Sequence, residues 1–360
     1  MPTMATDRAT QPTSLAAKLP DETLRKWLRD MLLIREFEVR SMQAYQNKKI
    51  GGFLHVYIGQ EAVAVGTIAA LNDDDPIITA YRDHGHALAR GTEARYCMAE
   101  MMGRVGGCAK GKGGSMHMFD RKRKMYGGHG IVGAQCPVGT GLAFATKYED
   151  EVLNGGRSSR VTLCFLGDGA LNQGAFHEAM NLAGVLDLPI IFICENNGYS
   201  MGTAIARGTT MAEDLTAKAL AYGFESASLD GMDLMAVYDG MKPIVEQCRE
   251  TSRPAFVEIR TYRFKGHSMS DPRKYRTKDE EQRYEAMDPI DRFSKYLRDE
   301  RGFTLEANEA MIKDVRKEIR EAIKWAEASP VPALDDLYTD VYTDSWGIYR
   351  GTKPPPMYDP

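Results

Sequence analysis

Two polar motifs, each at the end of an apolar run, constrain the fold of this chain more than any other feature of its sequence. Gly167-Asp168-Gly169 follows the apolar run 161–166, and Asn196-Asn197 follows the apolar run 190–194. Between the two runs, apolar residues recur at roughly helical spacing from Ala170 to Leu186. The order strand, helix, strand predicts a βαβ unit with two parallel strands.

Parallel strands end at the same edge of a sheet, so we expect the side chains of Asp168 and Asn197 to lie side by side there. Ligands of open α/β sheets bind at that edge. One carboxylate and one amide oxygen, completed by phosphates and water, form the kind of octahedral site that Mg²⁺ takes. The alternative is an ordinary βαβ turn in which Asp168 only caps the following helix.

Other glycine-rich phosphate motifs match this sequence less well. The dinucleotide fingerprint fails because Asn172 stands where the third glycine is required. The Walker pattern nearly matches from Gly106 to Lys112, but Gly113 replaces the Ser or Thr that would hold Mg²⁺. We therefore favour a magnesium-diphosphate site at Asp168 and Asn197 over a nucleotide site.

The composition of the 360-residue chain excludes several classes of protein. Its formal net charge is −4 and no long basic run occurs, so nucleic acid and anionic membranes are not expected partners. No apolar stretch approaches the roughly 18 residues of a membrane-spanning helix. The six cysteines form no CxxC pair, and we expect buried, reduced thiols with no zinc site.

We predict three segments along the chain. Residues 1–20 are rich in Thr, Ala, Pro and Ser and are expected to form a flexible arm. This arm is poor in arginine, which favours a bacterial cytoplasmic protein over one imported into the mitochondrial matrix. Residues 21–275 are expected to form an α/β domain, beginning with a helix capped by Asp21. Residues 276–360 are expected to form a helical extension and tail.

Residues 103–133 contain an unusual density of glycine. We expect no regular element there, because glycine weakens both helices and strands. A segment of this length between predicted elements is typical of a functional loop.

Four blocks of sequence resemble the alpha subunits of thiamine diphosphate-dependent 2-oxo acid dehydrogenases. The blocks keep the order and spacing of that family, and the resemblance extends from about Leu24 to Tyr342. They are Tyr81-Arg82-Asp83-His84-Gly85, Gly111-Lys112-Gly113-Gly114-Ser115-Met116-His117-Met118, Gly130-Ile131-Val132-Gly133-Ala134-Gln135 and Gly266-His267-Ser268-Met269-Ser270-Asp271-Pro272. The resemblance implies a parallel-sheet α/β fold with helices on both faces and a helical C-terminal extension.

The resemblance also implies two cofactors, thiamine diphosphate and Mg²⁺. Asp168, the side chain of Asn197 and the main-chain carbonyl of Tyr199 would hold the metal. Contacts to the diphosphate and the aminopyrimidine ring would come from several further positions: Tyr81, Arg82, Gly130, Val132, Gly169 and Ala170. Backbone N–H groups at the start of a helix favour a bound phosphate, and arginine offers a forked set of donors.

Two histidines match family positions near the reacting atoms. Imidazole titrates near neutral pH and suits proton transfer. We expect His267 to contact the cofactor phosphate and the reacting group, and His55 to contact the substrate carboxylate. A lone histidine is more often structural, and the sequence alone leaves that alternative open.

In the family, a glutamate of a separate beta subunit activates the cofactor, and no residue of this chain is assigned to that task. The resemblance therefore implies half of an active site in an α₂β₂ heterotetramer, which passes the acetyl group to the lipoyl group of an acetyltransferase core. Two blocks, Lys110–Ser115 and Gly266–Pro272, favour pyruvate as the substrate. Branched-chain 2-oxo acid dehydrogenase, acetoin dehydrogenase and a scaffold without activity remain alternatives.

Overall fold

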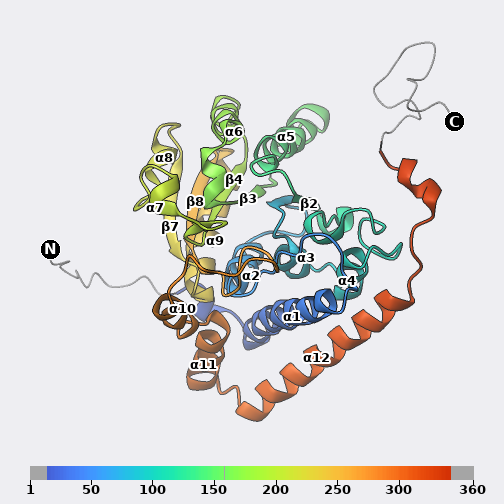
Figure 1. Ribbon diagram of the computed structural model, residues 1–360. Coiled ribbons are helices and arrows are strands. Elements are labelled where there is room, and N and C mark those ends of the chain that lie inside the picture. The colour runs from blue at the N-terminus through green and yellow to red at the C-terminus, as the bar shows by residue number, and fades with distance from the viewer. Residues whose placement is uncertain (1–13, 158, 342–360) are drawn as a thin grey trace.

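The fold is built on one six-stranded parallel sheet. In the computed structural model, which describes residues 14–157 and 159–341, the strand order is β2-β1-β3-β4-β8-β7 (Figure 1). The strands are β1 Ile77–Ala80, β2 Met125–His129, β3 Thr162–Gly167, β4 Ile190–Asn196, β7 Glu225–Asp230 and β8 Ala255–Arg260. All five pairings are parallel. A separate two-stranded hairpin joins β5 Tyr199–Ser200 to β6 Thr203–Ala204.

Helices cover both faces of the sheet, as the resemblance implies (Figure 1). Alternate residues of β3 and β4 enter two different cores: Leu163 and Ile191 face one, Cys164 and Phe192 the other. This alternation follows from the two-residue period of a strand. The first core includes side chains of α1 Asp21–Gln46, α2 Glu61–Ala69 and α9 Leu234–Thr251, and the second includes those of α5 Gln135–Tyr148 and α6 Gly174–Val185.

The remaining helices connect or enclose these layers. They are α3 His84–Ala89, α4 Ala94–Met101, α7 Ile205–Gly208, α8 Ala217–Leu220, α10 Lys278–Glu285, α11 Pro289–Arg301 and α12 Leu305–Ala328. Short 3-10 turns occupy Ala16–Lys18, Gly114–Met116, Arg121–Arg123, Asp168–Asn172 and Leu334–Tyr338, and a π-helical turn, Glu149–Leu153, extends α5. The long helix α12 lies along α1 and α4 (Figure 1).

Two predicted helix starts are wrong. Asp21 does not cap α1: it is the first helical residue, and Pro20 precedes it as the capping residue. The predicted helix from Ala170 begins instead as a 3-10 turn, Asp168–Asn172, and α6 starts at Gly174. Gln173 separates the two because its backbone is extended, with ψ 135°. Gly169 and Ala170 are therefore not at the N-terminus of an α-helix.

The expectation that residues 103–133 contain no regular element is also wrong, because β2 lies within them. Two glycines allow this strand where a side chain would not fit. Gly127 has φ +99°, and a Cβ on Gly128 would stand 2.0 Å from Oδ2 of Asp83. The rest of the segment is organised by the buried carboxylate of Glu100 in α4. It accepts hydrogen bonds from the backbone N–H groups of Ala109, Gly111, Gly113 and Gly114.

Residues 1–13 of the predicted arm and the tail from residue 342 lie outside the described residues. Within the described part of the arm, Ala16 is buried and its N–H donates to Asp239 in α9 at 2.7 Å. The division of the chain at residue 275 stays a prediction. All six cysteines are free and five are buried, as expected.

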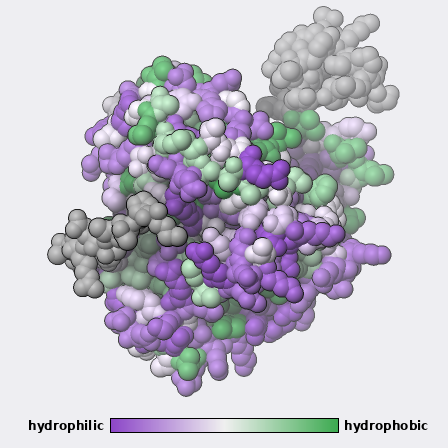
Figure 2. Space-filling view, turned by 60° about the vertical axis from the view of Figure 1, so that its left-hand side comes forward, coloured by the Kyte–Doolittle hydropathy of each residue, from purple (hydrophilic) through white to green (hydrophobic). Residues whose placement is uncertain are grey.

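The described part of the chain contains no helix that is both long enough and apolar enough to cross a membrane. The face shown in Figure 2 is mainly hydrophilic, with apolar side chains in small separate groups.

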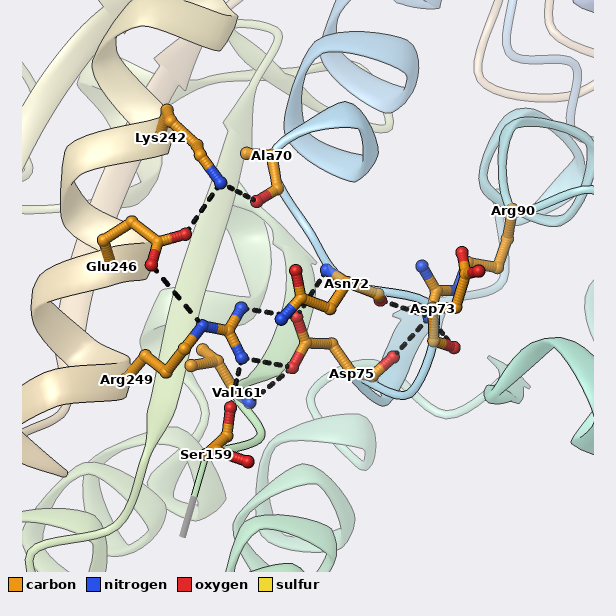
Figure 3. Close-up of polar contacts among 10 residues, drawn as sticks. All are labelled: Ala70, Asn72, Asp73, Asp75, Arg90, Ser159, Val161, Lys242, Glu246 and Arg249. Atoms are coloured by element: carbon orange, nitrogen blue, oxygen red, sulfur yellow. Dashed lines mark hydrogen bonds and ion pairs between the residues drawn. The ribbon is translucent and has the colours of Figure 1, made fainter.

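An ion-pair network fixes the amino edge of the sheet (Figure 3). Asp75 is completely buried just before β1 and accepts two hydrogen bonds from the Arg249 guanidinium of α9, at 2.7 and 2.9 Å. It also accepts from the backbone N–H groups of Asn72 and Val161. This carboxylate therefore joins the ends of α2 and α9 to the starts of β1 and β3.

We predict that Arg249→Ala lowers the free energy of unfolding by about 3 kcal/mol, because it leaves a buried carboxylate without its counter-ion. Arg253→Ala is the matched control, since Arg253 pairs with Asp187 on the surface with both side chains about half exposed. It should change stability by less than about 1 kcal/mol. Denaturant unfolding of both variants measures the difference, and equal losses would contradict this role for Asp75.

Candidate active site

The candidate site is a cavity at the carboxyl edge of the sheet, where the strand order reverses between β1 and β3. The chain moves from β1 outward to β2 and then returns to place β3 on the other side of β1. Such a switch point opens a crevice for ligands. The cavity is lined by Gln60, Ala80, Tyr81, Arg82, Val132, Gly133, Gln135, Gly167, Asp168, Gly169, Ala170, Glu195, Asn197, Tyr199, Ser200, Met201, Arg263 and His267.

Asp168 and Asn197 lie at adjacent strand ends, as predicted. Gly167, which directly precedes Asp168, is paired with Glu195 in the β3–β4 ladder. The side chains of Asp168 and Asn197 both line the cavity. Burial raises the pKa of the Asp168 carboxyl, which accepts a hydrogen bond from Ser200 Oγ at 3.2 Å. Gly169 makes room for that serine, since a Cβ there would meet Ser200 Oγ at 2.2 Å. A bound cation would offset the cost of burying this carboxylate.

Two buried arginines supply the positive charge of the cavity. Arg82 follows β1 and donates to the carbonyls of Val56 and His267, at 2.7 and 2.8 Å. Arg263 follows β8 and donates to Lys265 O, Asn197 Oδ1 and Tyr275 OH. Among the described residues, neither guanidinium forms an ion pair with a carboxylate. Burial, followed by repulsion from Arg263, lowers the pKa of Arg82 to about 10.

Tyr81, His55 and His267 form an aromatic cluster beside these arginines. The ring centroids of His55 and His267 are 5.1 Å apart, and that of Tyr81 is 4.7 Å from His55. Burial, with repulsion from Arg82, lowers the pKa of His55 to about 3 and that of His267 to about 4. Both imidazoles are therefore neutral at physiological pH. The buried Nδ1 of His55 has no hydrogen-bond partner in the described structure.

The loop that carries His267 is held by Asp271. The Asp271 carboxylate accepts from the backbone N–H groups of His267 at 2.6 Å and Arg273 at 2.8 Å, and from Tyr275 OH at 2.5 Å. Arg82 holds the other side through the His267 carbonyl. The imidazole thus reaches the cavity from a backbone fixed on two sides.

Most of the predicted site residues meet in this one cavity. Its lining includes Tyr81, Arg82, Val132, Asp168, Gly169, Ala170, Asn197, Tyr199 and His267. Two do not line it. His55 lies behind Tyr81 and His267, and Gly130 lies beside the His117 ring, which a Cβ at Gly130 would approach to 3.0 Å.

Five polar residues of the lining are not among the site residues predicted from the sequence: Gln60, Gln135, Glu195, Ser200 and Arg263. Arg263 follows the apolar run of β8 at the same sheet edge as Asp168. The rule that located Asp168 and Asn197 would have found it if it had been applied to this third strand. Gln60 carries no such signal, because it precedes a helix far away in the sequence.

The polar groups of the cavity fit a diphosphate bridged by a divalent cation. Two guanidinium groups without carboxylate partners offer charge-assisted hydrogen bonds to phosphate, and the buried Asp168 offers an oxygen ligand to the cation. No group of three or more His, Cys, Asp or Glu side chains in the described structure is placed to hold a metal. The predicted magnesium site is not such a group, because Asp168 is its one carboxylate and its other protein ligands would be the amide of Asn197 and the carbonyl of Tyr199.

Comparisons with known proteins agree with this geometry. Residues 29–335 match the family model described as dehydrogenase E1 component. The chain is 50% identical to the pyruvate dehydrogenase E1 component subunit alpha of Rickettsia prowazekii, over 88% of this chain and 95% of the relative. It is 46% identical to the protein of that name from Rhizobium meliloti, over 90% of this chain and 91% of the relative. A chloroplastic alpha-3 subunit of that component from Oryza sativa subsp. japonica is 41% identical, over 89% of this chain and 76% of the relative.

We predict that Arg263→Gln weakens thiamine diphosphate binding about 10- to 100-fold, the range for losing a charge-assisted hydrogen bond to a buried group. Arg260→Gln is the control: it removes a charge three residues away whose side chain is about half exposed. Calorimetric titration of the cofactor in the presence of Mg²⁺ compares the two variants. Equal losses in both would show that Arg263 is not a specific anion contact.

The two histidines should make stability fall as the pH is lowered. Their folded-state pKa values lie below the unfolded value of about 6.5, so protons bind preferentially to the unfolded chain. The stabilisation is complete above pH 6.5 and is lost as pH falls toward 4 and 3. Denaturant unfolding at a series of pH values gives the slope of the unfolding free energy against pH. His55→Asn should reduce this slope by up to about 1.4 kcal/mol per pH unit. The control His177→Asn, at an exposed histidine, should leave this slope unchanged. An unchanged slope for His55→Asn would refute the lowered pKa of His55.

Proposed function

This chain belongs to the dehydrogenase E1 component family, and from that premise we propose that it is the alpha subunit of the decarboxylating component of a pyruvate dehydrogenase complex. It catalyses the thiamine diphosphate-dependent oxidative decarboxylation of pyruvate and transfers the acetyl group to the lipoyl group of an acetyltransferase partner. It is thus an oxidoreductase that feeds acetyl-CoA synthesis. The observation that carries the proposal is the cavity that brings the buried Asp168 carboxylate together with two guanidinium groups, Arg82 and Arg263, that form no ion pair with a carboxylate among the described residues.

Each polar residue of the cavity then has a task. Asp168, the Asn197 side chain and the Tyr199 carbonyl hold Mg²⁺. Arg82 and Arg263 hold the diphosphate, with Tyr81 beside them, and the backbone of Gly169 and Ala170 contacts the phosphates. Gly130 and Val132 contact the aminopyrimidine through their backbones. The cofactor supplies the ring that accepts electrons when carbon dioxide leaves the substrate.

The histidines act as neutral groups. His267 lines the cavity and can donate one ring N–H while its other nitrogen accepts a proton. His55, which packs against Tyr81 and His267 and does not line the cavity, has a buried Nδ1 without a hydrogen-bond partner among the described residues; it would contact the substrate carboxylate only if substrate binding brought the two together. An anion bound next to either ring would raise its pKa from the low value that the two arginines impose. Substrate binding would therefore bring these imidazoles toward the range useful for proton transfer.

Among the described residues that line the cavity, we assign no carboxylate to the activation of the aminopyrimidine. The lining contains two carboxylates, Asp168 and Glu195, and Glu195 is engaged by the hydroxyl of Tyr57. Ile131 and Val132 on the other side are apolar and exposed, at 76% and 43%. A beta subunit that covers this surface and contributes a glutamate would complete the site, in an α₂β₂ heterotetramer.

The relatives favour pyruvate over a branched-chain 2-oxo acid or acetoin as substrate, because their names specify pyruvate dehydrogenase. The intact Asp168, Asn197 and His267 argue against a scaffold without activity. Bacterial relatives, from Rickettsia and Rhizobium, support a location in the bacterial cytoplasm over the mitochondrial matrix.

The test is 2-oxo acid-dependent reduction of an artificial electron acceptor. We predict activity with pyruvate only when the chain is assembled with its beta subunit and supplied with thiamine diphosphate and Mg²⁺. Asp168→Asn should reduce this activity at least 100-fold at limiting Mg²⁺, since it removes the charged metal ligand. Asp187→Asn, a change at an exposed surface ion pair, should retain full activity.

Normal activity of the chain alone would refute the half-site proposal. Preference for a branched-chain 2-oxo acid would show that pyruvate is not the preferred substrate and would leave the mechanism unchanged. A stable complex without activity on any 2-oxo acid would point to acetoin or to a scaffold.

A further inference from the structure

Four buried side chains form a line of polar contacts from Glu195 through Tyr57 and Gln60 to Asn197, and all of them except Tyr57 line the cavity. The hydroxyl of Tyr57 donates to Glu195 Oε1. The Gln60 side chain is close enough to the same hydroxyl to lower its pKa, against the larger rise caused by burial and Glu195. Asn197 Nδ2 donates to Gln60 Oε1 at 3.2 Å. None of the four residues is more than 8% exposed. We call this line the Glu195–Asn197 relay.

The carboxylate at one end fixes the direction of every bond in the relay. A carboxylate accepts only, so the single proton of Tyr57 must point to Glu195. The phenol oxygen must then accept from Gln60, which uses the NH₂ end of the Gln60 amide. The opposite end of that amide is its carbonyl, and it can only accept from the NH₂ group of Asn197.

This direction determines which atom of Asn197 remains for a ligand. With Nδ2 committed to Gln60, Oδ1 lies on the side of Tyr199 N and Arg263 Nη1, at 3.3 and 3.4 Å. A reversed amide would put its NH₂ group against these two donors and its oxygen against the Gln60 carbonyl. A metal ion binds the oxygen of an amide and not its NH₂ group, so the orientation decides whether Asn197 can be a ligand.

We propose that the Glu195–Asn197 relay holds the oxygen of Asn197 toward the Mg²⁺ site, which makes Gln60 and Tyr57 positioning residues for metal binding. The inference rests on the proposed function, because that function places Mg²⁺ between Asp168 and Asn197. A purely local role for Gln60 does not account for its side chain. Although Gln60 immediately precedes α2, its amide makes no capping hydrogen bond to that helix.

The first experiment measures Mg²⁺ affinity by calorimetry, with thiamine diphosphate present and with the full chain assembled with its beta subunit. Gln60→Leu should weaken Mg²⁺ binding about 10-fold, the lower range for losing a partner of a metal ligand. Tyr57→Phe, which keeps the ring and removes only the hydroxyl, should weaken it at least threefold. Tyr96→Phe removes a hydroxyl on α4, outside the cavity lining, and should leave the affinity unchanged.

The second experiment separates orientation from a general structural effect. In Asn197→Asp both terminal atoms are oxygens, so no orientation has to be selected. We expect Tyr57→Phe to change Mg²⁺ affinity less than twofold in that background, while it weakens binding in the Asn197 background. An equal loss in both backgrounds, or no loss in the Asn197 background, would overturn the relay.

Asp168→Asn distinguishes failure of the relay from failure of the metal site. If Asp168→Asn weakens Mg²⁺ binding and the relay variants do not, the relay is wrong and the metal site stands. If Asp168→Asn also leaves Mg²⁺ affinity unchanged, the metal site of the proposed function is wrong, and the relay has no metal to serve.

Discussion

The parallel pairing of β3 with β4 is the constraint on which the site depends. Six consecutive residue pairs, from Thr162–Ile190 to Gly167–Glu195, fix the relative positions of the two strand ends. A slip of one residue would move every side chain of a strand to the opposite face. Because apolar side chains fill both faces here, the register is held by two separate cores. The positions of Asp168 and Asn197 therefore follow from packing far below them.

The two edges of the sheet differ in how their charges are satisfied. At the amino edge, the buried carboxylate of Asp75 forms an ion pair with the half-buried guanidinium of Arg249. At the carboxyl edge, the buried Arg82 and Arg263 form no ion pair with a carboxylate in the described part of the chain, and the buried Asp168 accepts a hydrogen bond from Ser200. Buried charges without partners are costly. A ligand that brings an anion and a cation together would relieve that cost, which supports the proposal that this edge binds a ligand while the amino edge stabilises the fold.

Much of the architecture could be predicted from the sequence because it depends on local patterns. Apolar runs of strand length and the turns after them located β3 and β4, and the rule for parallel strands brought Asp168 and Asn197 together. Single capping residues were less informative, as Asp21 shows, because several nearby residues can begin a helix equally well.

The remaining features depend on contacts between distant parts of the chain, which a sequence pattern does not contain. Glycine density suggested no regular element in residues 103–133, yet a strand forms there and the buried Glu100 orders the surrounding turns. Gln60, which directly precedes α2, contacts Asn197 in the cavity although the two residues are 137 positions apart in the sequence.

We propose above all that the buried charges at the carboxyl edge of the sheet form a magnesium-diphosphate site. An experimental structure of the assembled enzyme with thiamine diphosphate and Mg²⁺ tests it most directly. The account predicts Asp168, Asn197 Oδ1 and the Tyr199 carbonyl at about 2.1 Å from the metal, with Arg82 and Arg263 on the diphosphate. A diphosphate bound elsewhere, or a metal without Asp168 among its ligands, would contradict it.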